Sequence, residues 1–130
     1  MKYKSYKKDV LKKMKQASNV SLEATGLEAQ RDITNKITAN TQVDTGRMRA
    51  SITYITGDKK GDIKTDNYGI KHNEDKPFGK LPDDTLHVGT NVKYAMYQEK
   101  FKPFLKPSII NNFRKYSKMM NEIFAKVMRS

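Results

Sequence analysis

The sequence contains no cysteine, which excludes disulfide bonds, thiolate metal sites and a cysteine nucleophile. It also lacks any apolar stretch approaching the roughly 18 residues of a membrane-spanning helix. The basic N-terminus is not followed by the apolar segment of a secretory signal peptide. These absences predict a protein that is made and used in a cytoplasm and that has no membrane partner.

Apolar residues are scarce as well. Hydrophobic residues make up 36% of the chain, and with the seven glycines they remain below the roughly 45–50% usual for globular domains. The length of 130 residues predicts a single domain, 1–130, with a thin hydrophobic core. Because contacts between subunits would stabilise such a domain, the composition favours a homo-oligomer.

Positive charge is the strongest compositional feature, with a formal net charge of +12. Residues 1–15 contain seven lysines and one aspartate, and residues 100–130 contain eight basic residues and one glutamate. The segment between them contains eleven basic and twelve acidic residues, so the excess lies at the two ends. Such ends attract nucleic acid or acidic protein surfaces, although a charge run is equally typical of a solvated helix face.

The lysines that we expect to contact DNA weakly, or to face an acidic partner, are Lys4, Lys7, Lys8, Lys12, Lys115 and Lys118. Lysine heavily outnumbers arginine at these ends, which favours diffuse attraction over bidentate recognition. Any DNA contact is therefore expected to be non-specific.

Hydrophobic periodicity predicts an α+β fold. Apolar or small residues recur at steps of three and four through 1–42 and predict a long N-terminal helix, bent or broken at Gly26. Residues 103–130 carry a second apolar stripe and predict a C-terminal amphipathic helix, with Pro107 in its first turn. The two stripes are Leu11, Met14, Ser18, Leu22, Gly26, Ala29, Ile33 and Ile37, and Ile109, Phe113, Tyr116, Met120, Ile123, Phe124 and Val127.

The middle segment, 43–99, predicts a small antiparallel sheet covered by the two helices. A turn at 43–46 leads into alternating residues at 47–54, which predict a half-buried strand with a polar outer face. Further strands are expected at 68–71, in a hairpin with the first, and at 86–89. Residues 73–85 predict a flexible loop, and 92–99 suit a helix or a strand.

No constellation of residues typical of catalysis is present. His72 and His87 lack the spacing of a metal site, and Ser51 has no evident base partner. Asp83 and Asp84 lie in the proline- and glycine-rich loop, where acidic pairs usually keep a segment solvated. The sequence therefore predicts no catalytic residue, no bound metal and no cofactor; a hydrolase using the acidic loop is the weakest alternative.

Three segments of the sequence form a recognisable set of motifs. Residues 43–52 read V-D-T-G-R-M-R-A-S-I, residues 88–99 read V-G-T-N-V-K-Y-A-M-Y-Q-E, and residues 103–108 read P-F-L-K-P-S. In this order, between a long helix and an amphipathic helix, they resemble the signature of a family of siphophage neck proteins. Members of that family are called tail-completion, head–tail joining or minor capsid proteins.

The resemblance implies a non-enzymatic structural subunit of the virion. Such a subunit forms a ring, commonly hexameric, and docks on a head-completion or connector protein, a tail terminator or the tail tube. One departure is visible, because the family's Phe-Gly-Thr after Tyr-x-Glu is absent and Glu99 leads almost directly to Pro103. Any partner contact made by that loop in relatives is therefore in doubt here.

The motif residues expected at subunit interfaces are Asp44, Thr45, Gly46, Arg47, Arg49, Ser51, Gly89, Thr90, Tyr94, Tyr97, Glu99, Phe104 and Pro107. Arg47 and Arg49 are expected on the polar strand face, where they pair with Glu99, with a neighbouring subunit or with solvent alone. The alternative to a structural subunit of the virion is a basic protein that binds nucleic acid without sequence preference.

Overall fold

A computed structural model of the chain describes residues 2–40, 46–57, 61, 63–73 and 84–129, without the side chains of 2–6. Its elements are α1 (Lys2–Ala39), α2 (Arg47–Ser51), β1 (Thr53–Thr56), β2 (Leu86–Gly89), α3 (Ala95–Phe101), α4 (Leu105–Asn111) and α5 (Phe113–Arg129). The α+β class with long terminal helices is confirmed. Most of the loop predicted at 73–85 lies outside the described residues.

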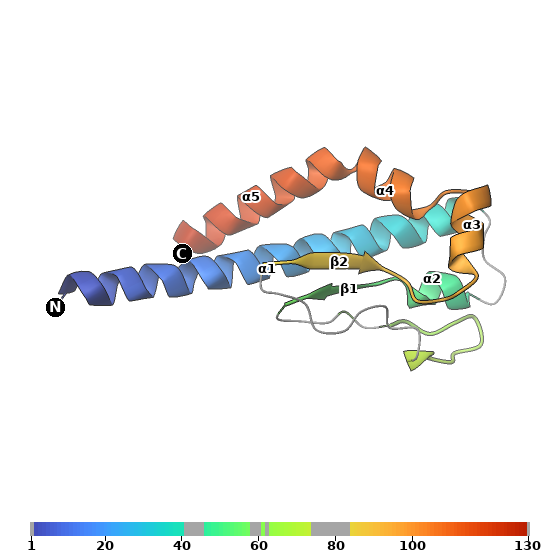
Figure 1. The fold of residues 1–130 in the computed structure, drawn as a ribbon, viewed down its shortest axis with the longest axis horizontal. Coiled ribbons are helices and arrows are strands. Elements are labelled where there is room, and N and C mark those ends of the chain that lie inside the picture. Colours follow the sequence, from blue (N-terminus) through green and yellow to red (C-terminus); the bar gives the residue numbers. More distant parts are fainter. Residues whose placement is uncertain (1, 41–45, 58–60, 62, 74–83, 130) are drawn as a thin grey trace.

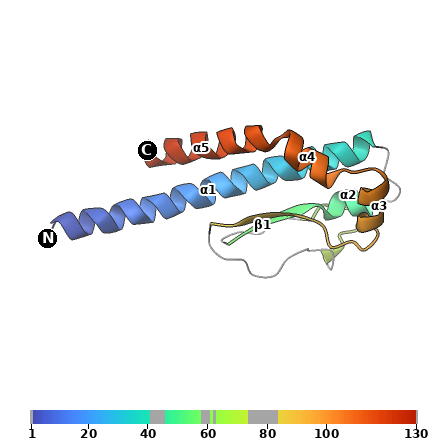
Figure 2. The same ribbon diagram turned by 45° about the horizontal axis from the view of Figure 1, so that its top comes forward.

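Helix α1 forms the middle layer of the molecule (Figures 1 and 2). The β1–β2 sheet lies on one side of α1, and α4 and α5 lie on the other side. The two terminal helices and the sheet pack together as predicted, with α1 lying between the sheet and the C-terminal helix. Because α1 has a partner on each side in its C-terminal half, that half is the best-buried part of the helix.

The predicted stripe of α1 is buried only from Leu22 onward. Ile33 and Ile37 are fully buried, whereas Leu11 and Met14 are 55% and 42% exposed. The difference arises because the sheet covers the C-terminal half of α1 and does not reach the N-terminal half (Figure 1).

Gly26 does not interrupt α1, contrary to the expectation of a bend or break. A Cβ atom at Gly26 would lie 2.8 Å from two ring atoms of Tyr54 and 2.9 Å from Leu86 Cδ1. A Cβ atom at Gly61 would lie 2.7 Å from two other atoms of the same ring. Two glycines thus hold the Tyr54 ring between them, and the absence of a side chain at Gly26 lets the sheet approach the helix.

The predicted strand at 47–54 is wrong in its first half, where the chain forms α2. Arginine, methionine and alanine are good helix formers, and the Ala50 N–H donates to the Gly46 carbonyl at 2.8 Å, closing a helical turn. The alternation seen in the sequence does not reflect a polar outer face, because Ser51 is fully buried.

Strand β1 pairs with β2 antiparallel, with Thr53 opposite Gly89 and Thr56 opposite Leu86. All four β1 residues are buried. On its other edge, the Gly61 N–H donates to the Tyr54 carbonyl at 2.7 Å. Because α1 covers β1 and no β1 residue is exposed, the predicted half-buried pattern is wrong, while the predicted strand at 86–89 is confirmed.

Residues 68–71 form a turn rather than the predicted strand. The Asp66 carboxylate accepts the backbone N–H groups of Tyr68 and Ile70 at 2.8 and 2.9 Å, and it lies 2.8 Å from His72 Nε2. A single bridge between Thr65 and Lys71 closes the turn. The hairpin with the first strand is therefore wrong.

The C-terminal helix is divided at Asn112 into α4 and α5. Asn112 has φ −107° and ψ 9°, and its side-chain amide donates to the Ser108 carbonyl at 2.8 Å. Asparagine favours such side-chain contacts over a continuous helix. The break leaves Phe113 64% exposed, so its predicted place in the apolar stripe is wrong, while Tyr116 is buried as predicted.

The hydrophobic core lies where α1, α2, α3 and α4 converge. Its buried members are Ile33, Ile37, Met48, Ile52, Val92, Ala95 and Phe104. Phe104, the largest of its fully buried side chains, comes directly before α4 and anchors that helix to the rest.

Candidate assembly surface

The V-D-T-G turn is described only at its glycine, because Val43, Asp44 and Thr45 lie outside the described residues. Gly46 has φ +83°, the left-handed conformation that glycine adopts without strain. A Cβ atom there would also lie 2.5 Å from Asn67 Oδ1. This conformation suits the turn predicted at 43–46, and the glycine precedes a helix rather than the predicted strand.

The two motif arginines lie on α2, and Arg49 is used inside the subunit. Its guanidinium donates to Asn67 Oδ1 at 3.0 Å and to Thr38 Oγ1 at 3.4 Å. Arg49 thereby links α2 to the end of α1 and to the 65–71 turn, and neither contact involves Glu99. Arg47 is the first residue of α2 and is half-buried.

Ser51 and Thr90 meet across the sheet end. The Ser51 hydroxyl donates to the Met48 carbonyl at 2.7 Å and shares a short hydrogen bond with Thr90 Oγ1. The Thr90 hydroxyl oxygen also accepts the Val92 N–H at 3.1 Å. Together with the buried Gly89, these contacts join α2 to the chain leaving β2, which is an internal role.

Glu99 caps α4. Its carboxylate accepts the backbone N–H groups of Phe104, Leu105 and Lys106 at 2.8, 2.9 and 3.0 Å. Partial burial acts to raise the pKa of the Glu99 carboxyl, but these donors outweigh it and hold the pKa below its ordinary value of 4.5. The carboxylate satisfies three N–H groups that a helix start otherwise leaves without partners, and it locks α3 to α4.

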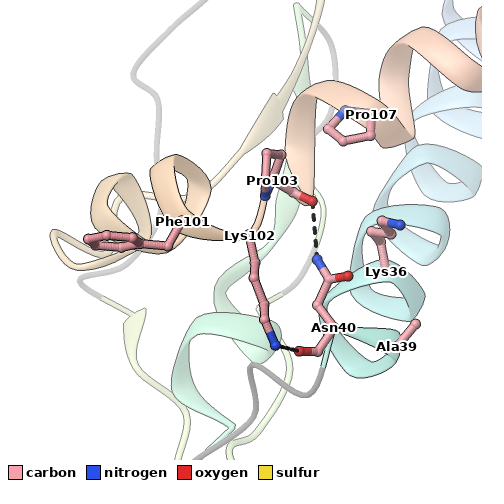
Figure 3. Close-up of a pocket in the computed structure, with 7 residues that line it drawn as sticks. All are labelled: Lys36, Ala39, Asn40, Phe101, Lys102, Pro103 and Pro107. Atoms are coloured by element: carbon pink, nitrogen blue, oxygen red, sulfur yellow. Dashed lines mark hydrogen bonds between the residues drawn. The ribbon is translucent and has the colours of Figure 1, made fainter.

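A second contact ties the same junction to α1, as Figure 3 shows. The Asn40 side-chain amide donates to the Pro103 carbonyl at 3.1 Å, and Lys102 Nζ donates to the Asn40 carbonyl at 3.2 Å. These residues border an open groove of about 550 Å³ that is also lined by Pro107 and Phe101. The shortened loop after Glu99 is therefore part of a braced corner.

Exposed apolar side chains gather on the outer face of α3. Met96, Tyr97 and Phe101, named here the α3 patch, are 79%, 66% and 79% exposed. Tyr94, just before the helix, is 42% exposed, whereas Ala95 faces the core. Single exposed apolar residues are normal on a monomer, but several on one short helix indicate a contact surface.

The lysines of the two chain ends differ in their surroundings. Lys115 Nζ lies 2.6 Å from Asp32 and 3.3 Å from Glu28 of α1, and the hydrogen bond to Asp32 raises its pKa. Lys118 is exposed and 4.0 Å from Glu122. Lys115 therefore pairs with two carboxylates of its own subunit.

On α1, Lys7, Lys8 and Lys12 are exposed. The side chain of Lys4 lies outside the described residues.

Sequence reasoning did not single out Met96, Phe101, Asn40 or Lys102. The signal for the first two was present, since positions 96, 97, 100 and 101 share one face if 95–101 is helical. That signal required a choice between helix and strand for 92–99. Asn40 and Lys102 are 62 residues apart in the sequence, and no local pattern connects them.

The motif residues thus brace a corner of the fold, and α3 presents apolar side chains outward. The chain belongs to the HK97-gp10-like family, described as "Bacteriophage HK97-gp10, putative tail-component", whose family model matches residues 4–100. The protein is therefore a bacteriophage tail component, a structural protein of the virion, in a family that is not one of enzymes. The family resemblance seen in the sequence is confirmed.

No curated protein and no solved structure shows significant similarity to the chain. Within the part of the chain that the structure describes, no three His, Asp or Glu side chains group as a metal site would require. None of the described helices is both long and apolar enough to cross a membrane.

Proposed function

We propose that the protein is a subunit of the ring that joins the phage head to the tail and completes the tail. Copies of the chain form a homo-oligomeric, hexameric ring. The ring docks on a head-completion or connector protein, and on the tail terminator or tail tube. Its work is protein–protein docking in virion assembly, without catalysis.

The observation that carries this proposal is the α3 patch. Aromatic residues and methionine are enriched at the centres of protein interfaces, where they fill pockets of the partner. Met96, Tyr97 and Phe101 are of these types. Met96 and Tyr97 lie within the segment that the family model matches, and Phe101 follows it directly. The patch therefore suits a contact with a neighbouring subunit or virion protein.

The bracing around α3 supports the same reading. The Glu99 cap and the Asn40–Lys102 contact hold α3 against both α4 and α1. A surface that is rigid before binding loses less conformational entropy when the complex forms. The braced corner is thus suited to a ring in which every subunit presents the same geometry.

A paired substitution tests the patch. Met96→Ser with Phe101→Ser should leave the free energy of unfolding within about 0.5 kcal/mol, because both side chains are exposed in the monomer. Ring formation should be lost in electron microscopy and mass measurement, and phage carrying the variant should accumulate unjoined heads and tails. Phe113→Ser, at a 64% exposed position on α5, is the matched control and should assemble normally.

The proposal fails if the double variant assembles and joins tails as the wild type does. It also fails if virions lacking the chain attach tails normally. Measuring joining in phage particles keeps the test valid when the isolated chain assembles only with its neighbours.

A further inference from the structure

The fold brings the two basic ends of the chain together. Helices α1 and α5 run antiparallel, so the N- and C-termini lie at the same end of the molecule (Figures 1 and 2). Residues 2–15 contribute seven lysines and one aspartate, and residues 118–129 contribute three basic residues and one glutamate. One end of the molecule therefore concentrates positive charge that the sequence places at opposite ends of the chain.

Between these helices lies a groove with an apolar floor, named here the terminal groove. It encloses about 380 Å³ and is lined by Leu11, Met14, Lys15, Ser18, Asp84 and Phe124. Leu11 and Met14 stay largely exposed, whereas Phe124 is half-buried against α1. The groove thus combines largely exposed apolar side chains with one lysine, Lys15, in its lining.

The apolar floor continues into the lysines along one face of α1. Lys7 and Lys8 precede Leu11 by four and three residues, and Met14 follows it by three, so all lie on one side of the helix. Helix α1 extends past the end of α5, so its first turns project beyond that helix (Figure 1).

A carboxylate of the chain already occupies one end of the terminal groove. The Ser18 hydroxyl donates to Asp84 Oδ1 at 2.6 Å, from a segment 66 residues away in the sequence. An acidic side chain carried by a separate piece of backbone therefore fits this face.

We propose that the terminal groove and the adjoining lysines bind an acidic amphipathic segment of another virion protein. Apolar side chains of that segment cover Leu11, Met14 and Phe124, and its carboxylates pair with the adjoining lysines, Lys7 and Lys8 among them. Duplex DNA is the poorer fit, because a phosphate backbone would neutralise the lysines and leave the apolar floor in water. This inference does not depend on the ring proposed above, which uses the α3 patch.

The test uses the full chain and a labelled synthetic helix with leucines at steps of three and four and glutamates between them. The reference probe is a peptide of the same composition reordered so that it has no apolar face. By fluorescence anisotropy, the amphipathic helix should bind at least about tenfold more tightly than the reordered peptide. Its affinity should fall with added salt but should not vanish, since apolar contacts are not screened.

Variants locate the contact. Leu11→Ser with Met14→Ser should remove the preference for the amphipathic helix, and both side chains are exposed enough for the variant to fold. Leu27→Ser, at a 57% exposed position on another face of α1, is the matched control and should keep the preference. Circular dichroism checks that each variant retains its helices.

Several outcomes overturn the proposal. They are equal binding of both peptides, no binding of either, or no effect of the Leu11 and Met14 substitutions. Tighter binding of duplex DNA, with an affinity that falls steeply and linearly in the logarithm of salt, would assign the basic end to nucleic acid instead.

Discussion

The two halves of α1 meet very different surroundings. Along residues 21–37 the helix buries a continuous stripe against the sheet, α2 and α4. Among residues 7–20, only Ala17 is buried, and the helix carries lysines and exposed apolar side chains. One continuous helix thus serves as the core of an α+β unit at one end and as a projecting cationic surface at the other. The comparison predicts that substitutions at and around residues 21–37 change the free energy of unfolding strongly, and that substitutions at residues 7–20 change it little.

The largest effect is expected in the convergent core. Phe104→Ala should lower the free energy of unfolding by about 3–5 kcal/mol, because it removes a fully buried ring and leaves a cavity. Phe101→Ala, three residues earlier and 79% exposed, should change it by less than about 0.5 kcal/mol. Urea unfolding followed by circular dichroism measures both. Similar effects for the two would contradict the placement of the core.

The contact between α1 and the sheet should come next. Gly26→Ala raises helix propensity by about 1 kcal/mol, yet its methyl group would meet a Tyr54 ring that Gly61 prevents from retreating. We expect a net loss of about 1–3 kcal/mol in the free energy of unfolding. Asn35→Ala, on the exposed face of the same helix, should be neutral or stabilising. A stabilised Gly26→Ala variant would show that the contact has room for a methyl group.

The Glu99 cap should give a smaller, pH-dependent effect. Glu99→Gln should cost about 1–2 kcal/mol near neutral pH, because charge-assisted hydrogen bonds at the start of α4 are weakened. Since folding lowers the pKa of Glu99 below 4.5, its contribution is present above that pH and is lost as pH falls through the folded-state pKa. The difference between wild type and variant should therefore shrink in acid.

Glu122→Gln, on the exposed side of α5, is the control for Glu99 and should show little difference from the wild type at any pH. A Glu99 difference that stayed constant down to the lowest accessible pH would argue against the cap.

The smallest effect is expected between α1 and α5. Tyr116→Phe removes the hydrogen bond from the hydroxyl to Asp32 Oδ2, 2.7 Å long, and should cost about 1 kcal/mol. Burial, and then the Asp32 carboxylate, raise the pKa of the Tyr116 hydroxyl above its ordinary value of 10.0. The contribution is therefore complete below pH 10.0 and declines as pH rises beyond it. Thermal unfolding of both proteins across this range is the measurement; a gap that widened in alkali would refute the assignment.

Local patterns in the sequence predicted those elements that keep some residues exposed beside a buried stripe. The α1 stripe from Leu22 to Ile37 and the strand at 86–89 follow from spacing alone. The positive φ of Gly46 follows from the turn chemistry around it. The alternation of residue types at 47–54 was misleading because its first half forms α2 and its second half enters β1, all of whose residues are buried. The alternation in the sequence therefore does not correspond to an alternation of buried and exposed side chains. Several motif residues expected at an interface, among them Arg49, Ser51 and Phe104, make contacts inside the subunit.

The sequence by itself determined the long terminal helices, the excess of positive charge at both chain ends and the family to which the protein belongs. Only the tertiary structure decided that those charged ends meet, that Glu99 caps α4 and that Gly26 admits the Tyr54 ring. The physical reason is the separation in sequence of the residues that interact. Helix periodicity and turn conformation depend on residues a few positions apart, whereas burial on two sides and pairing across helices depend on segments that the chain brings together only when it folds.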